Sequence, residues 1–179
     1  MSKEKYNRKK VYEYAKKWAY DRNPKYYNYD QIGGDCTNFI SQCILAGCKE
    51  MNYDKNNGWY YVNGNNKAPS WTGVEFLYKF LLTNKGKGPI GIETTIDNLE
   101  IGDIIQLSFD GKKFSHSLIV VERGSSINDT LVATHSFDTF GKKVIKYKFN
   151  NYRCLHIESK YREITKETKE AIEKCIKKV

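Results

Sequence analysis

Hydrophobic and polar residues recur with two different periods along this chain, and the periods divide it into a helical part and a strand part. In the first part, apolar positions fall three and four residues apart, as on one face of a helix. This spacing predicts helices over residues 7–20 and 36–47, and a third from residue 72 to about residue 81. The segment from Thr72 to Glu75 has the pattern of a capping box, which marks the start of the third helix.

In the second part the period becomes that of β-strands. The expected strands cover residues 101–109, 114–122, 130–137, 144–149 and 153–157. The Asp110-Gly111 dipeptide predicts a hairpin between the first two of them. A helical period returns over residues 164–179. Helices followed by an antiparallel meander indicate an α+β fold class, and we expect one domain over residues 1–179, in which 160–179 form a C-terminal helical extension.

Composition limits the location and the class of protein. With 40% hydrophobic and 28% charged residues in a chain of 179, the sequence has enough apolar content for a buried core. It has no apolar run long enough for a transmembrane helix, and its N-terminus lacks the apolar stretch of a signal peptide. These features predict a cytoplasmic protein, or an extracellular or cell-wall protein that is processed from a longer precursor.

Positive charge is concentrated near the N-terminus. Of the net charge of +9, a large share comes from residues 1–25, where the sequence has nine Lys or Arg and three acidic residues. A basic helix of this kind suits contact with an anionic polymer or membrane surface, and it suits equally a solvated surface without a partner. No zinc-finger spacing or RNA-recognition signature is present, so nucleic acid is not an expected partner. The pattern leaves the oligomeric state open.

The cysteines do not form a metal-binding or disulfide pattern. They are Cys36, Cys43, Cys48, Cys154 and Cys175. No Cys-x-x-Cys pair occurs among them, so the sequence predicts neither a metal site nor a cofactor. Cys36 and Cys43 lie about 10 Å apart on one predicted helix, too far for a disulfide, and reduced thiols are expected.

One cysteine stands at a special position. The segment Gly33-Gly34-Asp35-Cys36 predicts a tight turn that leads into the second helix. At a helix N-terminus, unpaired backbone N–H groups and the helix dipole favour negative charge, which predicts a lowered pKa for the Cys36 thiol and a nucleophilic role. The alternative interpretation is a cysteine buried for packing.

A cysteine nucleophile needs a base, and the sequence has three histidines. His116 begins an expected strand, where its alternative interpretation is an ordinary surface histidine. If this strand pairs with the next one, residues whose numbers sum to about 252 lie opposite each other, which brings His135 or Asp138 beside His116. An imidazole that deprotonates a thiol also needs a polar partner that fixes its orientation. Cys36, His116 and His135 supply such a set, with Asp138 as the alternative to His135.

Several short segments, in order between residues 6 and 140, carry a resemblance to a known family. They are Tyr6-Asn7-Arg8, Tyr14-Ala15, residues 33–42, Trp59-Tyr60, residues 70–74, Gly102-Asp103, His116-Ser117 and His135-Ser136. In these segments the chain resembles the putative amidase domain family of Gram-positive bacteria, within the papain-like cell-wall cysteine peptidases of the NlpC type.

The resemblance implies a papain-like fold in which N-terminal helices pack on an antiparallel sheet. It also implies a thiol hydrolase that cleaves amide or peptide bonds, with bacterial peptidoglycan as substrate, through a thioester acyl-enzyme. Cys36 is then the nucleophile, His116 the general base and acid, and His135 the third member of the triad. The candidates for substrate contact or an oxyanion hole are Asp35, Tyr29, Trp59, Trp71 and Asp138.

Two other functions remain open on the sequence. The same thioester intermediate supports an acyltransferase or transamidase. A chain that keeps the fold without catalysis is a binding module, with the basic first helix as the docking surface for anionic cell-wall polymers.

Overall fold

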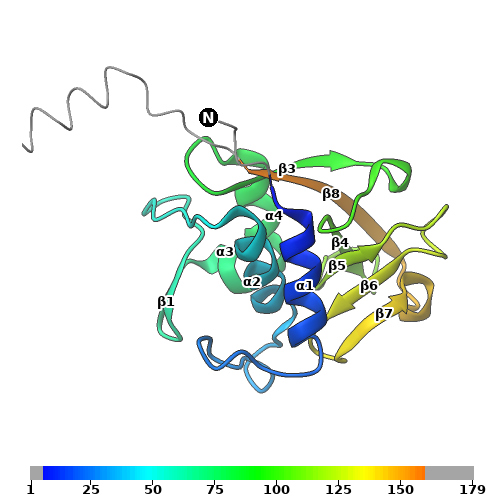
Figure 1. The fold of residues 1–179 in the computed structure, drawn as a ribbon, viewed down its shortest axis with the longest axis horizontal. Helices are drawn as coiled ribbons and strands as arrows, with labels where there is room; N and C mark the ends of the chain where they lie inside the picture. Colours follow the sequence, from blue (N-terminus) through cyan, green and yellow to red (C-terminus); the bar gives the residue numbers. More distant parts are fainter. Residues whose placement is uncertain (1–5, 160–179) are drawn as a thin grey trace, which may run out of the picture.

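The computed structural model describes residues 6–159, which form a mixed α+β structure (Figure 1). The helices are α1 (Arg8–Trp18), α2 (Cys36–Cys48), α3 (Pro69–Thr72) and α4 (Val74–Thr83), with 3-10 helices η1 (Ile96–Asn98) and η2 (Val144–Tyr147). The larger sheet contains β3 (Pro89–Thr94), β4 (Ile104–Ser108), β5 (His116–Glu122), β6 (Leu131–Thr134), β7 (Thr139–Lys143) and β8 (Asn151–Ser159). A small hairpin contains β1 (Tyr61–Asn63) and β2 (Asn66–Lys67). The expected C-terminal helix and Cys175 lie outside the described residues.

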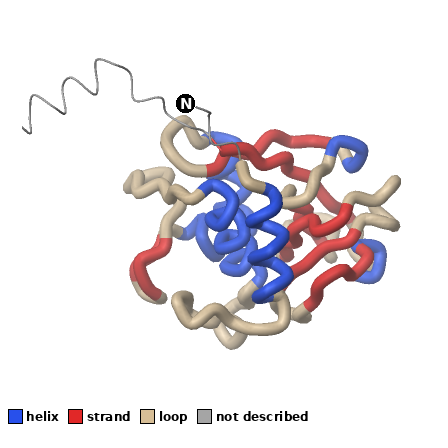
Figure 2. Tube along the Cα trace, in the orientation of Figure 1, coloured by secondary structure: helices blue, strands red, loops and turns tan. Residues whose placement is uncertain are grey.

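The six strands of the larger sheet are antiparallel and stand in the order β3-β8-β4-β5-β6-β7. Figure 2 shows α1, α2 and α4 gathered on one side of this sheet. Because side chains alternate along a strand, the sheet separates two cores. Ile119 and Ala133 lie in the core shared with the helices, whereas Leu118 and Val120 lie in the core on the other face. Among the described residues, no helix has the length and apolar character needed to cross a bilayer.

The structure confirms most of the pattern read from the sequence. Helices α1 and α2 fall within or beside the predicted ranges, and the Asp110-Gly111 turn joins β4 to β5. The predicted register between β5 and β6 is also confirmed, since Ile119 pairs with Ala133 and Val120 pairs with Val132. The α+β class is therefore correct.

The predicted capping box is wrong. Thr72 ends the short helix α3, which begins at Pro69. Proline lacks a backbone N–H, but at the first position of a helix this N–H would have no partner within the helix. Gly73 then takes an extended conformation and becomes the N-cap of α4, with no side-chain capping bond. The extended glycine separates two helices where the sequence pattern predicted one.

The strand predicted over residues 144–149 is also wrong. This segment forms η2, and the edge strand that pairs with β6 is β7, just before it. The chain must cross from the β7 edge to β8, which lies beyond β4 and β5, so residues 144–149 connect strands and do not pair. The sequence pattern did not predict β3, and β8 extends beyond the predicted residues 153–157 at both ends. β3 pairs with β8, and β8 pairs also with β4, so both strands depend on partners that are distant in the sequence.

A buried carboxylate attaches α1 to the sheet. Asp103 has no exposed side-chain surface, and its carboxylate lies 2.8 Å from a guanidinium nitrogen of Arg8. It also accepts a hydrogen bond from the Ile157 N–H at 2.9 Å and lies 2.9 Å from Nδ1 of His156. Nearby, the Tyr6 hydroxyl donates to the Gly102 carbonyl. The beginning of the described chain is thus held by β8 and by the loop before β4.

We expect Arg8→Ala to lower the free energy of unfolding by about 3 kcal/mol, because it leaves the buried Asp103 carboxylate without its cationic partner. Urea denaturation measures this change. Lys9→Ala, at the next residue on an exposed side chain, is the matched control and is expected to change stability by less than about 0.5 kcal/mol. Equal losses in the two variants would contradict the role given to Arg8.

Candidate functional site

Cys36 is the first residue of α2, and a turn at Gly33 and Gly34 connects the preceding loop to this helix. Gly33 and Gly34 have φ angles of 84° and 96°, which favour glycine. A Cβ at Gly34 would lie 3.1 Å from the Ser136 Oγ, so the turn also packs closely on the loop that follows β6. Asp35 is the N-cap, and Cys36 is only 7% exposed.

Hydrogen-bond donors surround the Cys36 sulfur, but burial determines the direction of its pKa. Burial raises the pKa of the Cys36 thiol, and the bonds from the Ser117 N–H and from Thr37 lower it by less. The nearby Asp35 charge raises it further, and the net pKa lies above the ordinary value. The lowered thiol pKa predicted from the helix start is therefore wrong for this conformation, because desolvation outweighs the helix N-terminus.

The Ser117 N–H is available to the sulfur because a strand ends beside it. The paired residues of β5 and β6 run from Glu122 to Ile119, and β6 ends at Thr134. The Thr134 hydroxyl bonds the Ser117 carbonyl, which leaves the Ser117 N–H for Cys36. Since this N–H belongs to the peptide bond between His116 and Ser117, the sulfur lies next to the backbone of His116.

The His116 side chain is buried among aromatic rings. Its ring centroid lies 6.2 Å from that of Phe109 and 5.7 Å from that of Tyr147. Burial, with a smaller effect from the Lys142 charge, lowers the pKa of His116 to about 4. Its Nε2 is buried and has no hydrogen-bond partner. Buried polar atoms without partners are rare, so this neutral imidazole nitrogen calls for a functional explanation.

The three predicted triad residues lie around one end of β5 and β6 without bonding one another. Among residues 6–159, no hydrogen bond joins the Cys36 sulfur to either imidazole, and none joins His116 to His135. Alternation along β5 directs Ser117 toward α2, where its Oγ lies 3.1 Å from the Thr37 Oγ1. Ser117, not His116, is therefore the residue of this pair whose side chain bonds α2.

His135 and Asp138 have other partners. The His135 Nδ1 lies 2.6 Å from the Asp35 carboxylate, and its Nε2 lies 2.8 Å from the Trp18 carbonyl. Asp138 forms two hydrogen bonds with the Arg22 guanidinium, each 2.9 Å long. Neither residue is hydrogen-bonded to His116, so neither orients it through such a bond in this conformation.

The aromatic candidates lie in the core. Trp59 and Trp71 have no exposed surface, and their indole N–H groups donate to Ser41 and Asn38 of α2. Both tryptophans therefore hold α2 in place and are not available to a ligand in this conformation. The Tyr29 hydroxyl donates to the Gly64 carbonyl at 3.0 Å, and burial raises the pKa of Tyr29 to about 12.

Sequence reasoning missed the polar side chains that connect α2 to the sheet. Ser117 bonds both Thr37 and the Gln106 side chain, which in turn accepts a hydrogen bond from Arg153. Thr37 and Ser117 each follow a predicted catalytic residue in the sequence. Their hydroxyl groups, next to these residues, were the sequence feature that could have predicted a polar contact here. Gln106 is a polar residue at a fully buried strand position, which is the same kind of signal.

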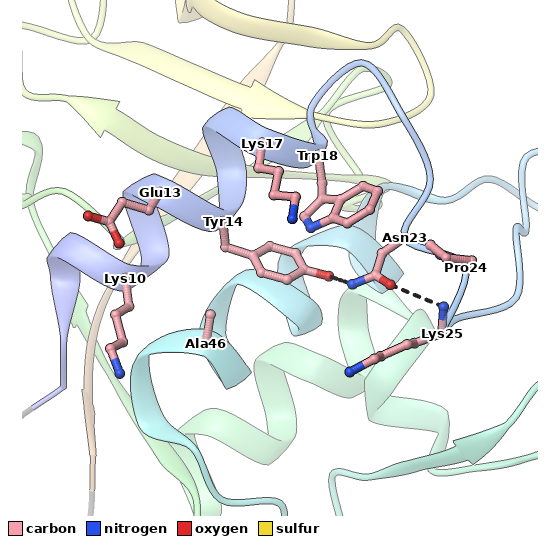
Figure 3. A pocket seen from close by; sticks show the side chains of 9 residues that line it. All are labelled: Lys10, Glu13, Tyr14, Lys17, Trp18, Asn23, Pro24, Lys25 and Ala46. Atoms are coloured by element: carbon pink, nitrogen blue, oxygen red, sulfur yellow. Dashed lines mark hydrogen bonds between the residues drawn. The ribbon is translucent and has the colours of Figure 1, made fainter.

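A separate hollow of about 570 Å³ lies against α1 (Figure 3). Its lining residues are Lys10, Glu13, Tyr14, Lys17, Trp18, Asn23, Pro24, Lys25 and Ala46. The Lys17 Nζ lies 5.0 Å from the centre of the Trp18 ring, and the Tyr14 hydroxyl accepts a bond from Asn23. Part of the basic N-terminal segment thus borders a surface hollow with aromatic walls.

The described part of the chain has no group of three His, Cys, Asp or Glu side chains arranged to hold a metal ion. Cys36, Cys43, Cys48 and Cys154 are free thiols.

Comparisons with known proteins place these features in a family. The sequence model of a family described as a putative amidase domain matches residues 5–162. The chain is also 34% identical over 137 residues to the uncharacterized protein YhbB of Bacillus subtilis (strain 168), an alignment that covers 75% of this chain. The chain spans 42% of the length of that relative. No solved structure matches the chain.

Because the pKa of His116 is lowered, the free energy of unfolding should depend on pH. His116 stays neutral in the folded protein down to about pH 4, whereas an unfolded histidine takes up a proton near pH 6.5. Between about pH 4 and pH 6.5 the unfolded state therefore binds more protons than the folded state. The contribution of His116 to the free energy of unfolding is complete above pH 6.5 and is lost as the pH falls toward 4. We expect a loss of about 3 kcal/mol from this residue.

Urea denaturation at pH 7 and at pH 4.5 measures the loss, with His116→Gln as the comparison. The variant should lose less stability on acidification than the wild type, because its amide does not titrate. A variant that loses as much as the wild type would show that the His116 pKa is not lowered.

Proposed function

Because the chain belongs to the putative amidase domain family, we propose that it is a cysteine hydrolase that cleaves amide or peptide bonds in bacterial peptidoglycan, with Cys36 as the nucleophile. Membership of the family supports amide hydrolysis. The observation that carries the cysteine mechanism is the buried sulfur at the start of α2, beside the backbone of a histidine whose Nε2 has no partner.

We further propose that His116 is the base. Its Nε2 has no hydrogen-bond partner, whereas both ring nitrogens of His135 are hydrogen-bonded. In the resting protein the proton stays on sulfur, since burial raises the pKa of Cys36 and lowers that of His116. Rotation of the His116 side chain toward the sulfur on substrate binding allows proton transfer during attack, and hydrogen bonds in free enzymes often tighten only in this complex.

The proposed reaction has two halves. The Cys36 sulfur forms a bond to the substrate carbonyl carbon while its proton passes to the imidazole of His116, and the amine leaves with that proton. Water then attacks the thioester carbon, its proton passes to His116, and the acid is released as the sulfur regains the proton. No metal or cofactor takes part in this scheme.

The Cys36 N–H is the proposed donor to the oxyanion. It is the first backbone N–H of α2, and the Asp35 side chain makes no capping bond to the backbone N–H groups of this helix. The N-cap side chain therefore does not occupy the N–H groups of the first turn, and a developing negative charge at a helix N-terminus is favoured. The proposal includes a papain-like fold, and an extracellular or cell-wall location, where peptidoglycan is found.

We expect Cys36→Ser and His116→Gln to lower the rate of amine release from purified peptidoglycan by about four to six powers of ten. Cys48→Ser, at the other end of the same helix, is the matched control and is expected to retain the wild-type rate. New amino groups are measured by chemical labelling of the digest. A Cys36→Ser variant with wild-type activity would falsify the cysteine mechanism.

An added amine separates hydrolysis from acyl transfer. We expect the free acid to remain the main product when glycinamide is present in excess, because water attacks the thioester in the proposed reaction. Mass spectrometry of the digest distinguishes the acid from the glycinamide adduct. A dominant adduct would assign the chain to the acyltransferases.

The lysine-bordered hollow supports a second candidate function, binding of an anionic cell-wall polymer without catalysis. Lys10 and Lys17 lie on α1 at its edge, and Lys25 follows in the loop. For a binding module, we expect Lys10→Glu with Lys17→Glu to weaken co-sedimentation with purified cell walls by about tenfold, or about 1.4 kcal/mol.

The same charge change at Lys55 and Lys79, which are exposed elsewhere, is the control. Equal binding by both double variants would remove the hollow as the docking surface.

A further inference from the structure

The buried imidazole of His135 lies between two groups that accept hydrogen bonds. Its Nε2 is 2.8 Å from the Trp18 carbonyl, and its Nδ1 is 2.6 Å from the Asp35 carboxylate. Side chains of both His135 and Asp35 are 1% exposed, so water does not supply alternative partners. A carbonyl only accepts, so Nε2 carries a hydrogen, and a neutral imidazole has no second donor for the carboxylate.

The surroundings of Asp35 favour the ionised carboxylate. One oxygen accepts hydrogen bonds from the Tyr29 N–H at 2.9 Å and from the Asn38 side-chain amide at 2.8 Å. The other oxygen lies 3.7 Å from Nε of Arg22. With the carboxylate ionised, the short contact to Nδ1 requires a hydrogen on that nitrogen as well, and both ring nitrogens of His135 are donors.

Two helix ends favour the same charges. Trp18 is the last residue of α1, so the imidazole faces the negative end of that helix dipole. Asp35 is the N-cap of α2, so its carboxylate lies at the positive end of the other dipole. A protonated His135 and an ionised Asp35 therefore match the field at each end of the gap between the helices.

The contacts also fix where α2 begins. Asp35 is held at two points, since its carboxylate bonds His135 and its N–H donates to the Ser136 Oγ at 2.8 Å. The His135 ring stacks on Phe39, one turn into α2, with centroids 4.0 Å apart. The end of β6 thus holds the residue directly before Cys36.

We propose that His135 is a positioning residue: a doubly protonated imidazolium that acts through Asp35 to hold Cys36 against the Ser117 N–H. It does not act on His116. The role in positioning a nucleophile rests on the proposed function of Cys36, whereas the protonation of His135 does not depend on it.

The first experiment is nitrogen NMR of the histidine rings in the wild-type protein at neutral pH. We expect one ring with two N–H nitrogens that exchange slowly, assigned to His135 by elimination with His116→Gln and His156→Gln. A His135 ring with one protonated nitrogen would overturn the proposal. This measurement needs no substrate and no change at His135, so it is independent of Cys36 catalysis and of whether a His135 variant folds.

The second experiment compares Asp35→Asn, His135→Gln and the double variant on purified peptidoglycan. Because the two residues act as one unit, we expect each to lower kcat on the order of 100-fold, with KM and the shape of the pH profile unchanged, and the double variant to lose no more than either single variant. Asp30→Asn, which neutralises another carboxylate bonded to Arg22, is the control and should retain the wild-type kcat.

If His135 were instead the third member of a catalytic triad and oriented His116, the variants would behave differently. His135→Gln would then shift the limb of the pH profile that belongs to His116, and Asp35→Asn would not reproduce the shift. That result, or losses in the double variant equal to the product of the single losses, would overturn the positioning role.

Discussion

The bond between Asp35 and His135 joins the helical half of the protein to the sheet at the point where the proposed nucleophile begins. The two residues are 100 positions apart in the sequence, and both are buried. Because polar groups are costly to bury without partners, this bond stabilises the positions of the ends of α1 and α2 that surround it. The turn before Cys36 and the loop after His135 depend on this contact for their packing.

Burial has opposite effects on the two groups of the proposed dyad. It raises the pKa of Cys36 and lowers that of His116, and both shifts keep the proton on sulfur. An ion pair between thiolate and imidazolium is thus disfavoured until the two groups approach each other. A resting thiol of this kind is protected from adventitious reaction, and the proposed catalysis requires a change of geometry on substrate binding.

The segments that resemble the family divide by what they do in the fold. Tyr6, Arg8, Gly102 and Asp103 come together to attach α1 to the sheet, and none of them contacts Cys36 by hydrogen bonding. The indole N–H groups of Trp59 and Trp71 donate hydrogen bonds to side chains of α2. Residues of the shared motifs are therefore not all site residues, and these six hold α1 or α2 in place.

Local structure could be predicted from the sequence alone: the helix that begins at Cys36, the hairpin at Asp110-Gly111 and the register of β5 with β6 each follow from periodicity and turn residues close in the chain. The sequence also singled out Cys36 and the histidines by residue type. The partners of these residues depend on the folded arrangement of the whole chain. Burial, not the helix dipole, determined the direction of the Cys36 pKa, and the early end of β6 paired His135 with Asp35, since desolvation and contacts between distant residues are properties of the folded chain.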